Sequence, residues 1–206
     1  MLIFAMAMLG VQAYGTLSWL PSMMVRSFHE PIARVGVFLG VTYATASVSG
    51  IVLGAWCATN LKIGGTGNRY LAWSLLCAGI VCITGSLAPL LNTSVGAYVT
   101  ASCMFAAQSA WMGSTIAAVQ LAVPSGIRAS LTAVIFFCTN VLGLTIGPSG
   151  VAAITQYVFH DPLSLSYAIS IMSAASGALA VLGMALSFRR FPKLGATLES
   201  SNLPDY

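Results

Sequence analysis

The 206-residue sequence predicts an all-α membrane protein, a bundle of six transmembrane helices in an inverted 3+3 repeat. The first observation behind this prediction is composition, since 58% of the residues are hydrophobic, 6% are charged, and the mean hydropathy is +0.90. Soluble domains carry about 25% charged residues, so the polar surface of a water-soluble fold is missing and the bilayer must be the solvent. The second observation is six long apolar runs separated by short stretches rich in Gly, Pro and charge.

Each apolar run reaches the length of about 20 residues that a membrane helix needs. The predicted helices cover residues 2–24, 35–58, 70–91, 95–121, 129–157 and 164–188, within one bundle over residues 1–188. A membrane barrel would instead require short segments of alternating polarity. Residues 189–206 are predicted to form a polar cytoplasmic tail that need not be ordered.

The basic residues predict the direction of insertion, because cytoplasmic loops carry an excess of Lys and Arg. Arg26 and Arg34 lie on one side, and the other side holds Lys62, Arg69, Arg128, Arg189, Arg190 and Lys193. Both termini are therefore predicted to be cytoplasmic, in a multi-pass protein of the cell or inner membrane. Met1 opens directly on apolar residues without a signal peptide, and we expect it to lie inside a longer reading frame rather than at a natural N-terminus.

Asp, Glu, His, Lys and Arg are absent from all six predicted helices. The four carboxylates, Glu30, Asp161, Glu199 and Asp205, lie in loops or in the tail. Proton relays and ion sites usually use ionisable groups inside the membrane, so we expect no proton-coupling residue in this chain. The five cysteines show neither metal-ligand nor disulfide spacing, and we expect no metal or cofactor. No basic stripe with interleaved aromatic residues favours nucleic-acid binding.

Two weak self-similarities predict the repeat. Gln12 in the first helix matches Gln108 in the fourth at an offset of 96 residues. The Gly50-xxx-Gly54 pair in the second helix matches Gly143-xxx-Gly147 in the fifth at an offset of 93. Because each unit has three helices, the second copy enters from the opposite side of the membrane, as in many secondary transporters.

Polar side chains near the middle of helices 1, 2, 4 and 5 predict a cavity. An amide buried in hydrocarbon without a partner costs several kcal/mol, so such groups face protein or a wet space. Helices 3 and 6 carry no amide or charge and are predicted to face lipid. The candidate solute contacts are Gln12, Tyr14, Tyr43, Gln108, Trp111 and Asn140. The alternative for each single amide is that it only links helices together.

Helix 5 also carries a predicted kink. Pro148 removes a backbone hydrogen bond and clashes with the carbonyl group one turn earlier. Gly143 and Gly147 allow a neighbouring helix to approach closely, as Gly50 and Gly54 do on helix 2. These residues are candidates for a gating motion; the alternative is an inert kink.

The most distinctive motif surrounds the start of helix 5. It reads Gln120-xx-Val123-Pro124-xxx-Arg128, then Asn140-xx-Gly143-xxx-Gly147-Pro148-x-Gly150. Supporting pieces are Trp19-Leu20-Pro21 with Arg26, Gly36 with Gly40, and Gly50 with Gly54. Over residues 5–188 the chain thereby resembles the C-terminal half, helices seven to twelve, of a spinster-like transporter of the major facilitator superfamily.

One departure concerns the end of helix 2. Thr59 and Asn60 stand where spinster-like sequences usually have an acid and a base, which puts a charge-based cytoplasmic latch in doubt. Arg128 is a candidate either for pairing with a helix C-terminus or the absent half, or for a positive-inside anchor. The resemblance implies that the binding site is shared with a missing N-terminal six-helix half or with a second six-helix chain.

The sequence thus predicts a carrier that works by alternating access and is not an enzyme, with the lipid bilayer and a small organic or amphipathic solute as partners. The main alternative is a non-transporting six-helix subunit or degenerate half-transporter. An intramembrane serine protease is formally suggested by Gly147-Pro148-Ser149-Gly150, but His160 lies in a loop and no later helix offers a histidine as the base.

Overall fold

The computed structural model describes residues 1–60, 66–161 and 164–201, and all of the secondary structure over these residues is helical. Six long helices follow one another: α1 Leu2–Phe28, α2 Ile32–Asn60, α3 Thr66–Leu87, α4 Ser94–Ala122, α5 Arg128–Ala153 and α6 Leu165–Ser201. Three short segments lie between them: the 3-10 turns η1 Ala88–Leu90 and η2 Ser125–Ile127, and the π-helix η3 Ile154–Phe159. The all-helical membrane fold predicted from composition and apolar runs is confirmed.

The ends of the helices differ from the predicted ones for local reasons. The run predicted to reach residue 91 stops at Leu87, since Pro89 occupies the first turn of η1. The predicted fifth helix divides into α5 and the π-helix η3, which ends at His160 in a left-handed conformation with φ 53°. His29 closes α1 in the same way, with φ 52°. The backbone of α6 continues to Ser201, into residues predicted as a polar tail.

Five of the six helices are long and apolar enough by length and composition to cross a membrane. The exception is α4, although it has 29 residues. Its polar side chains, among them Gln108, Ser114 and Thr115, lower its hydropathy. They lie against α3 and the interior of the bundle, so a helix surrounded by other helices carries more polar groups than one facing lipid.

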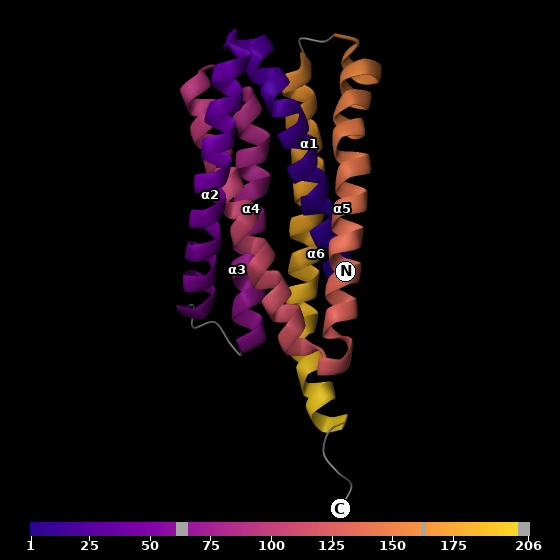
Figure 1. Cartoon of the computed structure of the whole chain (residues 1–206). Coiled ribbons are helices and arrows are strands. Elements are labelled where there is room, and N and C mark those ends of the chain that lie inside the picture. Colours follow the sequence, from indigo (N-terminus) through magenta and orange to yellow (C-terminus); the bar gives the residue numbers. More distant parts are fainter. Residues whose placement is uncertain (61–65, 162–163, 202–206) are drawn as a thin grey trace, which may run out of the picture.

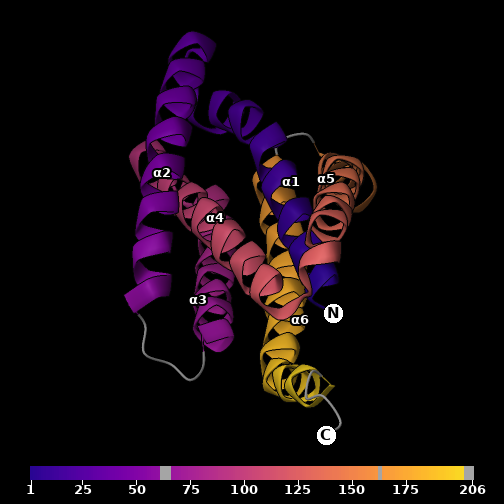
Figure 2. The same ribbon diagram turned by 60° about the horizontal axis from the view of Figure 1, so that its bottom comes forward.

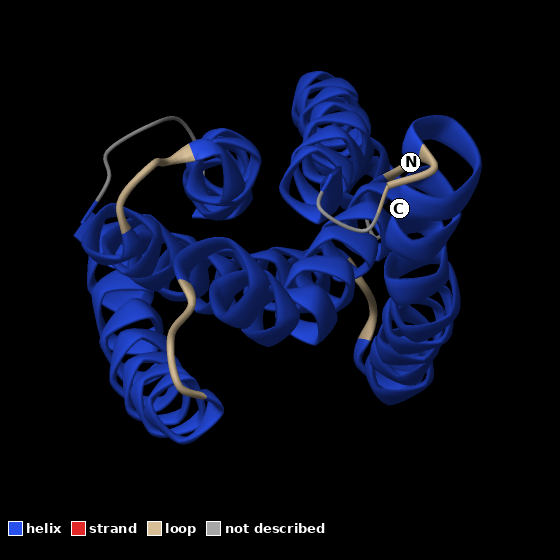
Figure 3. Cartoon of the chain, turned by 90° about the horizontal axis from the view of Figure 1, so that it is seen from above, coloured by secondary structure: helices blue, strands red, loops and turns tan. Residues whose placement is uncertain are grey.

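The helices form two groups of three, α1 with α5 and α6, and α2 with α3 and α4 (Figures 1 and 2). The most extensive contacts are α1–α5, α1–α6, α2–α4, α3–α4 and α3–α6, so α3 and α6 join the two groups. Seen end-on in Figure 3, the helices stand side by side along one axis. Residues far apart in sequence therefore meet at the same depth in the bundle.

Basic residues separate to the two ends of the bundle. Arg26 and Arg34 lie where α1 ends and α2 begins, and Arg34 Nη1 pairs with Glu30 Oε2 at 3.3 Å. Arg69, Arg128 and Arg189 lie at the opposite end, where α3 and α5 begin and where α6 extends beyond the other helices (Figure 1). Lys62 lies outside the described residues, and the side chains of Arg190 and Lys193 are not described.

Candidate functional site: a cavity between four helices

A cavity of about 160 Å³ lies near the middle of the bundle, between α1, α2, α4 and α5. Its lining includes five of the six side chains singled out as solute contacts, namely Tyr14, Tyr43, Gln108, Trp111 and Asn140. Among the described residues, none from α3 or α6 lines it. The remaining lining residues are Gly10, Ala13, Leu17, Met104, Phe105, Ser109, Met112 and Thr139. None of the described lining residues carries a formal charge.

The α1–α5 side of the cavity is held by side-chain hydrogen bonds. The Tyr14 hydroxyl on α1 donates to Asn140 Oδ1 on α5 at 2.5 Å, and the two residues are 126 positions apart in the sequence. Asn140 Nδ2 donates in turn to the carbonyl oxygen of Phe136 at 2.8 Å. Both ends of the Asn140 amide are thereby fixed, which orients this side chain at the cavity wall.

The α2–α4 side is aromatic. The Tyr43 ring meets the Phe105 ring edge to face, with centroids 5.0 Å apart. One turn along α4, Gln108 Nε2 donates to the carbonyl oxygen of Leu9 on α1 at 3.4 Å. Gln108 therefore reaches across the cavity towards α1 and joins the two helix groups.

Three polar atoms of the lining are buried and make no hydrogen bond within the described residues. They are Gln108 Oε1, Trp111 Nε1 and Thr139 Oγ1. Buried polar atoms are almost always paired, so these two acceptor-capable oxygens and one donor are unused binding capacity at the cavity wall. Thr139 was missed from the sequence, where its position beside Asn140 was the available signal.

Gln12 lies elsewhere. Its side chain is 1% exposed, and Nε2 donates to the carbonyl oxygen of Val81 on α3 at 2.8 Å. It does not line the cavity, although the predicted internal repeat would align it with Gln108. The bond to Val81 links α1 to α3, which is the helix-linking role that a midspan amide can also play.

The candidate gating glycines are points of close helix contact. A Cβ atom built on Gly147 would lie 2.7 Å from the backbone nitrogen of Gly15, and one on Gly143 would lie 3.0 Å from the carbonyl oxygen of Gly10. On the other side, a Cβ on Gly54 would lie 2.9 Å from Ala110 Cα, and Gly50 faces the backbone of Ala106. Only glycine permits this approach, so the small-residue pairs of α2 and α5 have a packing role at both seams.

Pro148 lies inside α5, and its carbonyl oxygen accepts a hydrogen bond from Trp19 Nε1 at 2.9 Å. At the other end of this helix, Arg128 Nε donates to the carbonyl oxygen of Val123, the C-cap of α4, at 2.8 Å. Of the alternatives open for Arg128, this contact corresponds to pairing with a helix C-terminus. At the end of α2, Thr59 and Asn60 put a charge-based latch in doubt. Here Arg69 Nη1 donates to the carbonyl oxygen of Thr59 at 3.2 Å.

A second groove of about 520 Å³ adjoins the central cavity and shares Ser109 and Met112 with it. It runs between α2, α4 and α5 to Thr59 and Tyr70, at the end of the bundle that holds Arg69 and Arg128. Within the described residues, no three His, Cys, Asp or Glu side chains come together as a metal site.

A helical membrane bundle with a central cavity of uncharged polar groups is the class of protein that this geometry defines. Two solved structures have a similar fold over the whole chain. They are of a bacterial homologue of the human lysosomal transporter Spinster, one inward-facing and unoccupied (TM-score 0.63, 15% identity) and one inward-facing and occupied (TM-score 0.65, 14% identity).

The chain spans about half the length of each of these structures, 49% and 50%. It has the fold of one half of these transporter structures, and it is an integral multi-pass membrane protein. No family model and no curated protein matches the sequence.

Proposed function

We propose that this chain is one half of a secondary carrier and moves a small neutral or amphipathic organic solute by alternating access. The observation that carries the proposal is the convergence of Tyr14, Tyr43, Gln108, Trp111 and Asn140, from four helices, on one uncharged cavity. Convergent polar groups in an apolar pocket are typical of ligand sites. The candidate contacts are these five residues and Thr139; Gln12 is assigned to linking α1 with α3.

The size of the cavity supports a shared site. Small-molecule pockets have volumes of about 300–1,000 Å³, and this one has about 160 Å³. One six-helix wall is therefore too small a site for an organic solute of ordinary size. We infer that the rest of the site comes from a missing N-terminal half or from a second six-helix chain. The same inference places any coupling residue outside this chain.

The contact pattern supports an inverted repeat. An inverted repeat would exchange α1 with α4, α2 with α5, and α3 with α6. This exchange turns the α1–α5 contact into α2–α4, turns α1–α6 into α3–α4, and leaves α3–α6 unchanged. All of the extensive contacts are related in this way. At the residue level, the approach of Gly143 to Gly10 corresponds to that of Gly50 to Ala106. With the excess of basic residues at one end, this arrangement also favours both termini in the cytoplasm.

A transport role is favoured over proteolysis by the environment of Ser149. Its hydroxyl donates to the carbonyl oxygen of Thr145, one turn earlier on the same helix. A serine bound in this way has no base to activate it.

The proposal is tested on the native product. A tag placed after Tyr206 at the chromosomal locus gives the size of the native protein on a denaturing gel beside a chain that begins at Met1, and allows its purification with any partner. We expect a native band about twice the size of the shorter chain. If the two bands have the same size, the rest of the site must come from a second copy of the chain or from a separate partner.

The purified product is then reconstituted in vesicles, and the solutes retained from an organic mixture are identified by mass spectrometry. We expect Asn140→Ala and Gln108→Ala to abolish the retention seen with the wild type. Ser102→Ala on α4 is the matched control, because its hydroxyl bonds only its own helix at Tyr98, at 2.7 Å. Folded wild-type protein that retains no solute would instead support a non-transporting subunit.

A further inference from the structure

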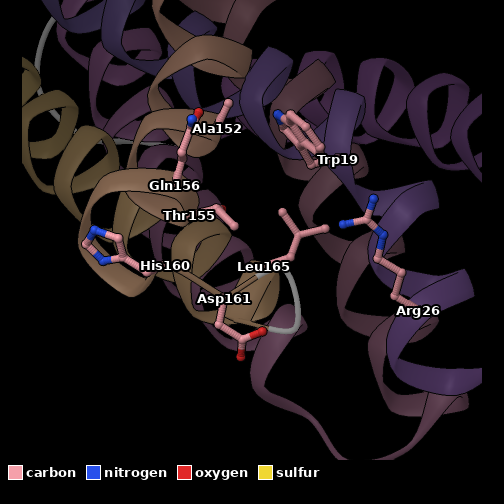
Figure 4. A pocket seen from close by; sticks show the side chains of 8 residues that line it. All are labelled: Trp19, Arg26, Ala152, Thr155, Gln156, His160, Asp161 and Leu165. Carbon is pink, nitrogen blue, oxygen red and sulfur yellow. The ribbon is translucent and has the colours of Figure 1, made fainter.

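An open hollow of about 390 Å³, here called the outer hollow, lies at the end of the bundle opposite Arg69 and Arg128. Its lining comes from α1, the end of α5, η3 and the start of α6: Trp19, Arg26, Ala152, Thr155, Gln156, His160, Asp161 and Leu165 (Figure 4). It shares no lining residue with the central cavity. Because α6 makes few contacts with α5 and η3, the outer hollow stays open where these helices diverge.

The charge that faces the outer hollow is positive. The Arg26 guanidinium group is directed towards Leu165, whereas the Asp161 carboxylate and the His160 ring are directed away from Arg26, Trp19 and Leu165 (Figure 4). Asp161 Oδ2 also accepts a hydrogen bond from Ser164 Oγ at 3.2 Å. The only carboxylate of the described lining therefore points elsewhere, and a negatively charged group beside Arg26 is not opposed by it.

Arg26 has no hydrogen-bond or ion-pair partner within the described residues. In contrast, Arg34 forms an ion pair, and Arg69 and Arg128 donate to carbonyl oxygens. Arg189, which also lacks a partner there, is not part of the outer hollow. A guanidinium group carries five N–H donors, so those of Arg26 are available to a ligand.

The polar and apolar parts of the outer hollow lie at different depths. Arg26 and Trp19 share one face of α1, because they are seven positions apart. Arg26 is close to the end of α1 at Phe28, and Trp19 lies about 10 Å deeper in the bundle at 1.5 Å per residue. The indole ring is held there by its bond to the Pro148 carbonyl oxygen. The positive charge is thus near the membrane surface and the aromatic wall is nearer the bilayer interior.

From this arrangement we propose that the outer hollow binds the negatively charged headgroup of an amphiphile, whose apolar chain lies against Trp19 and leaves by the open side. The headgroup accepts hydrogen bonds from Arg26, whose planar guanidinium matches carboxylates and phosphates. The Gln156 amide, on the π-helix η3, is a further donor in the lining, and π-helices are frequent at functional sites. An anionic bilayer lipid and a free fatty acid share this chemistry, so each serves as a probe.

The test uses Trp19 as the reporter, because bromine atoms on a lipid chain quench the fluorescence of a tryptophan that they contact. The native product is reconstituted in phosphatidylcholine bilayers with increasing fractions of a brominated probe. One pair of probes is brominated phosphatidylglycerol and brominated phosphatidylcholine, and the other is dibromostearate and its methyl ester. The part of the quenching that Trp19→Phe removes belongs to Trp19.

We expect the anionic probe to reach half of the Trp19 quenching at about a fivefold lower fraction than its neutral counterpart, the effect of one basic residue near the membrane surface. A preference in the phosphatidylglycerol pair alone would support a bilayer lipid as the ligand, and one in the dibromostearate pair alone would support a free amphiphile.

Variants assign the preference to one side chain. Arg26→Gln is expected to abolish the fivefold preference. Arg34→Gln removes the same charge at the same end of the bundle, outside the outer hollow, and is expected to leave the preference unchanged. Both arginines are exposed, so both variants are expected to fold. If Trp19→Phe does not fold, the two arginine variants are compared on the total tryptophan quenching.

Equal quenching by the anionic and neutral probes of both pairs would overturn the proposal. A preference that survives in Arg26→Gln would also overturn it, as would equal losses in Arg26→Gln and Arg34→Gln, because these would show attraction to general positive charge. The assay measures binding only, and its outcome is independent of whether the central cavity supports transport.

Discussion

The seams α1–α5 and α2–α4 are extensive contacts in the two helix groups, but they are built differently. In α1–α5, glycines lie on both helices, and two directional hydrogen bonds cross the seam, from Tyr14 to Asn140 and from Trp19 to Pro148. In α2–α4, the glycines Gly50 and Gly54 face alanines, and the described side-chain contacts are aromatic, Phe38 with Tyr98 and Tyr43 with Phe105.

The difference indicates that the α1–α5 side of the cavity is held in a fixed geometry, whereas the α2–α4 side can adjust. Hydrogen bonds have a preferred geometry and set the register of α1 against α5. Aromatic edge contacts tolerate a wider range of offsets, so α2 can shift against α4 at lower cost. Solute-dependent movement is therefore expected first along α2, beside the groove that leads from the cavity to Thr59.

The largest effect is expected from breaking the tighter seam. Gly147→Ala places a methyl group 2.6 Å from the carbonyl oxygen of Val11 and 2.7 Å from the nitrogen of Gly15, both backbone atoms that cannot move aside alone. We expect a loss of about 3 kcal/mol in the free energy of unfolding, measured by denaturant titration in detergent. Gly40→Ala, on α2, is the control because no atom lies within 4 Å of its added Cβ. Equal stability of the two variants would show that the α1–α5 seam is not tightly packed.

A smaller effect is expected from removing a hydroxyl group on each side of the cavity. Tyr14→Phe loses the hydrogen bond to Asn140 and should lower the free energy of unfolding by about 1 kcal/mol. Tyr43→Phe retains the ring contact with Phe105, and within the described residues its hydroxyl makes no hydrogen bond, so no measurable change is expected. Thermal unfolding midpoints of the two variants give the comparison, and a larger shift for Tyr43→Phe would reverse the assignment of the two walls.

The smallest effect is expected at Ser149, next to Pro148 on the same seam. Because its hydroxyl bonds only Thr145 of its own helix and its side chain is exposed, Ser149→Ala should change the free energy of unfolding by less than about 0.5 kcal/mol. Solute flux should also stay close to that of the wild type. Complete loss of flux, together with a proteolytic activity in the wild type that the variant lacks, would instead make Ser149 a nucleophile.

The lining of the central cavity was predicted as far as the position of polar residues along each helix allows. Tyr14, Tyr43, Gln108, Trp111 and Asn140 stood out because polar groups are rare in the middle of apolar runs, and helices 3 and 6 lacked amides, as the lining of the cavity reflects. Gln12 met the same criterion but faces α3. Depth along a helix is readable from the sequence, whereas the direction in which a side chain points depends on which neighbour packs against that face.

By itself, the sequence determined the membrane setting, the helical class and the separation of basic residues to two ends, because composition and run length control partitioning into a bilayer. Only the tertiary structure decided the pairing of α1 with α5 and of α2 with α4, and the bond between Tyr14 and Asn140. These contacts join residues far apart in the sequence, 56 positions for Gly50 and Ala106 and 126 for Tyr14 and Asn140. The helix pairings depend on close packing of small residues whose partners no local pattern specifies.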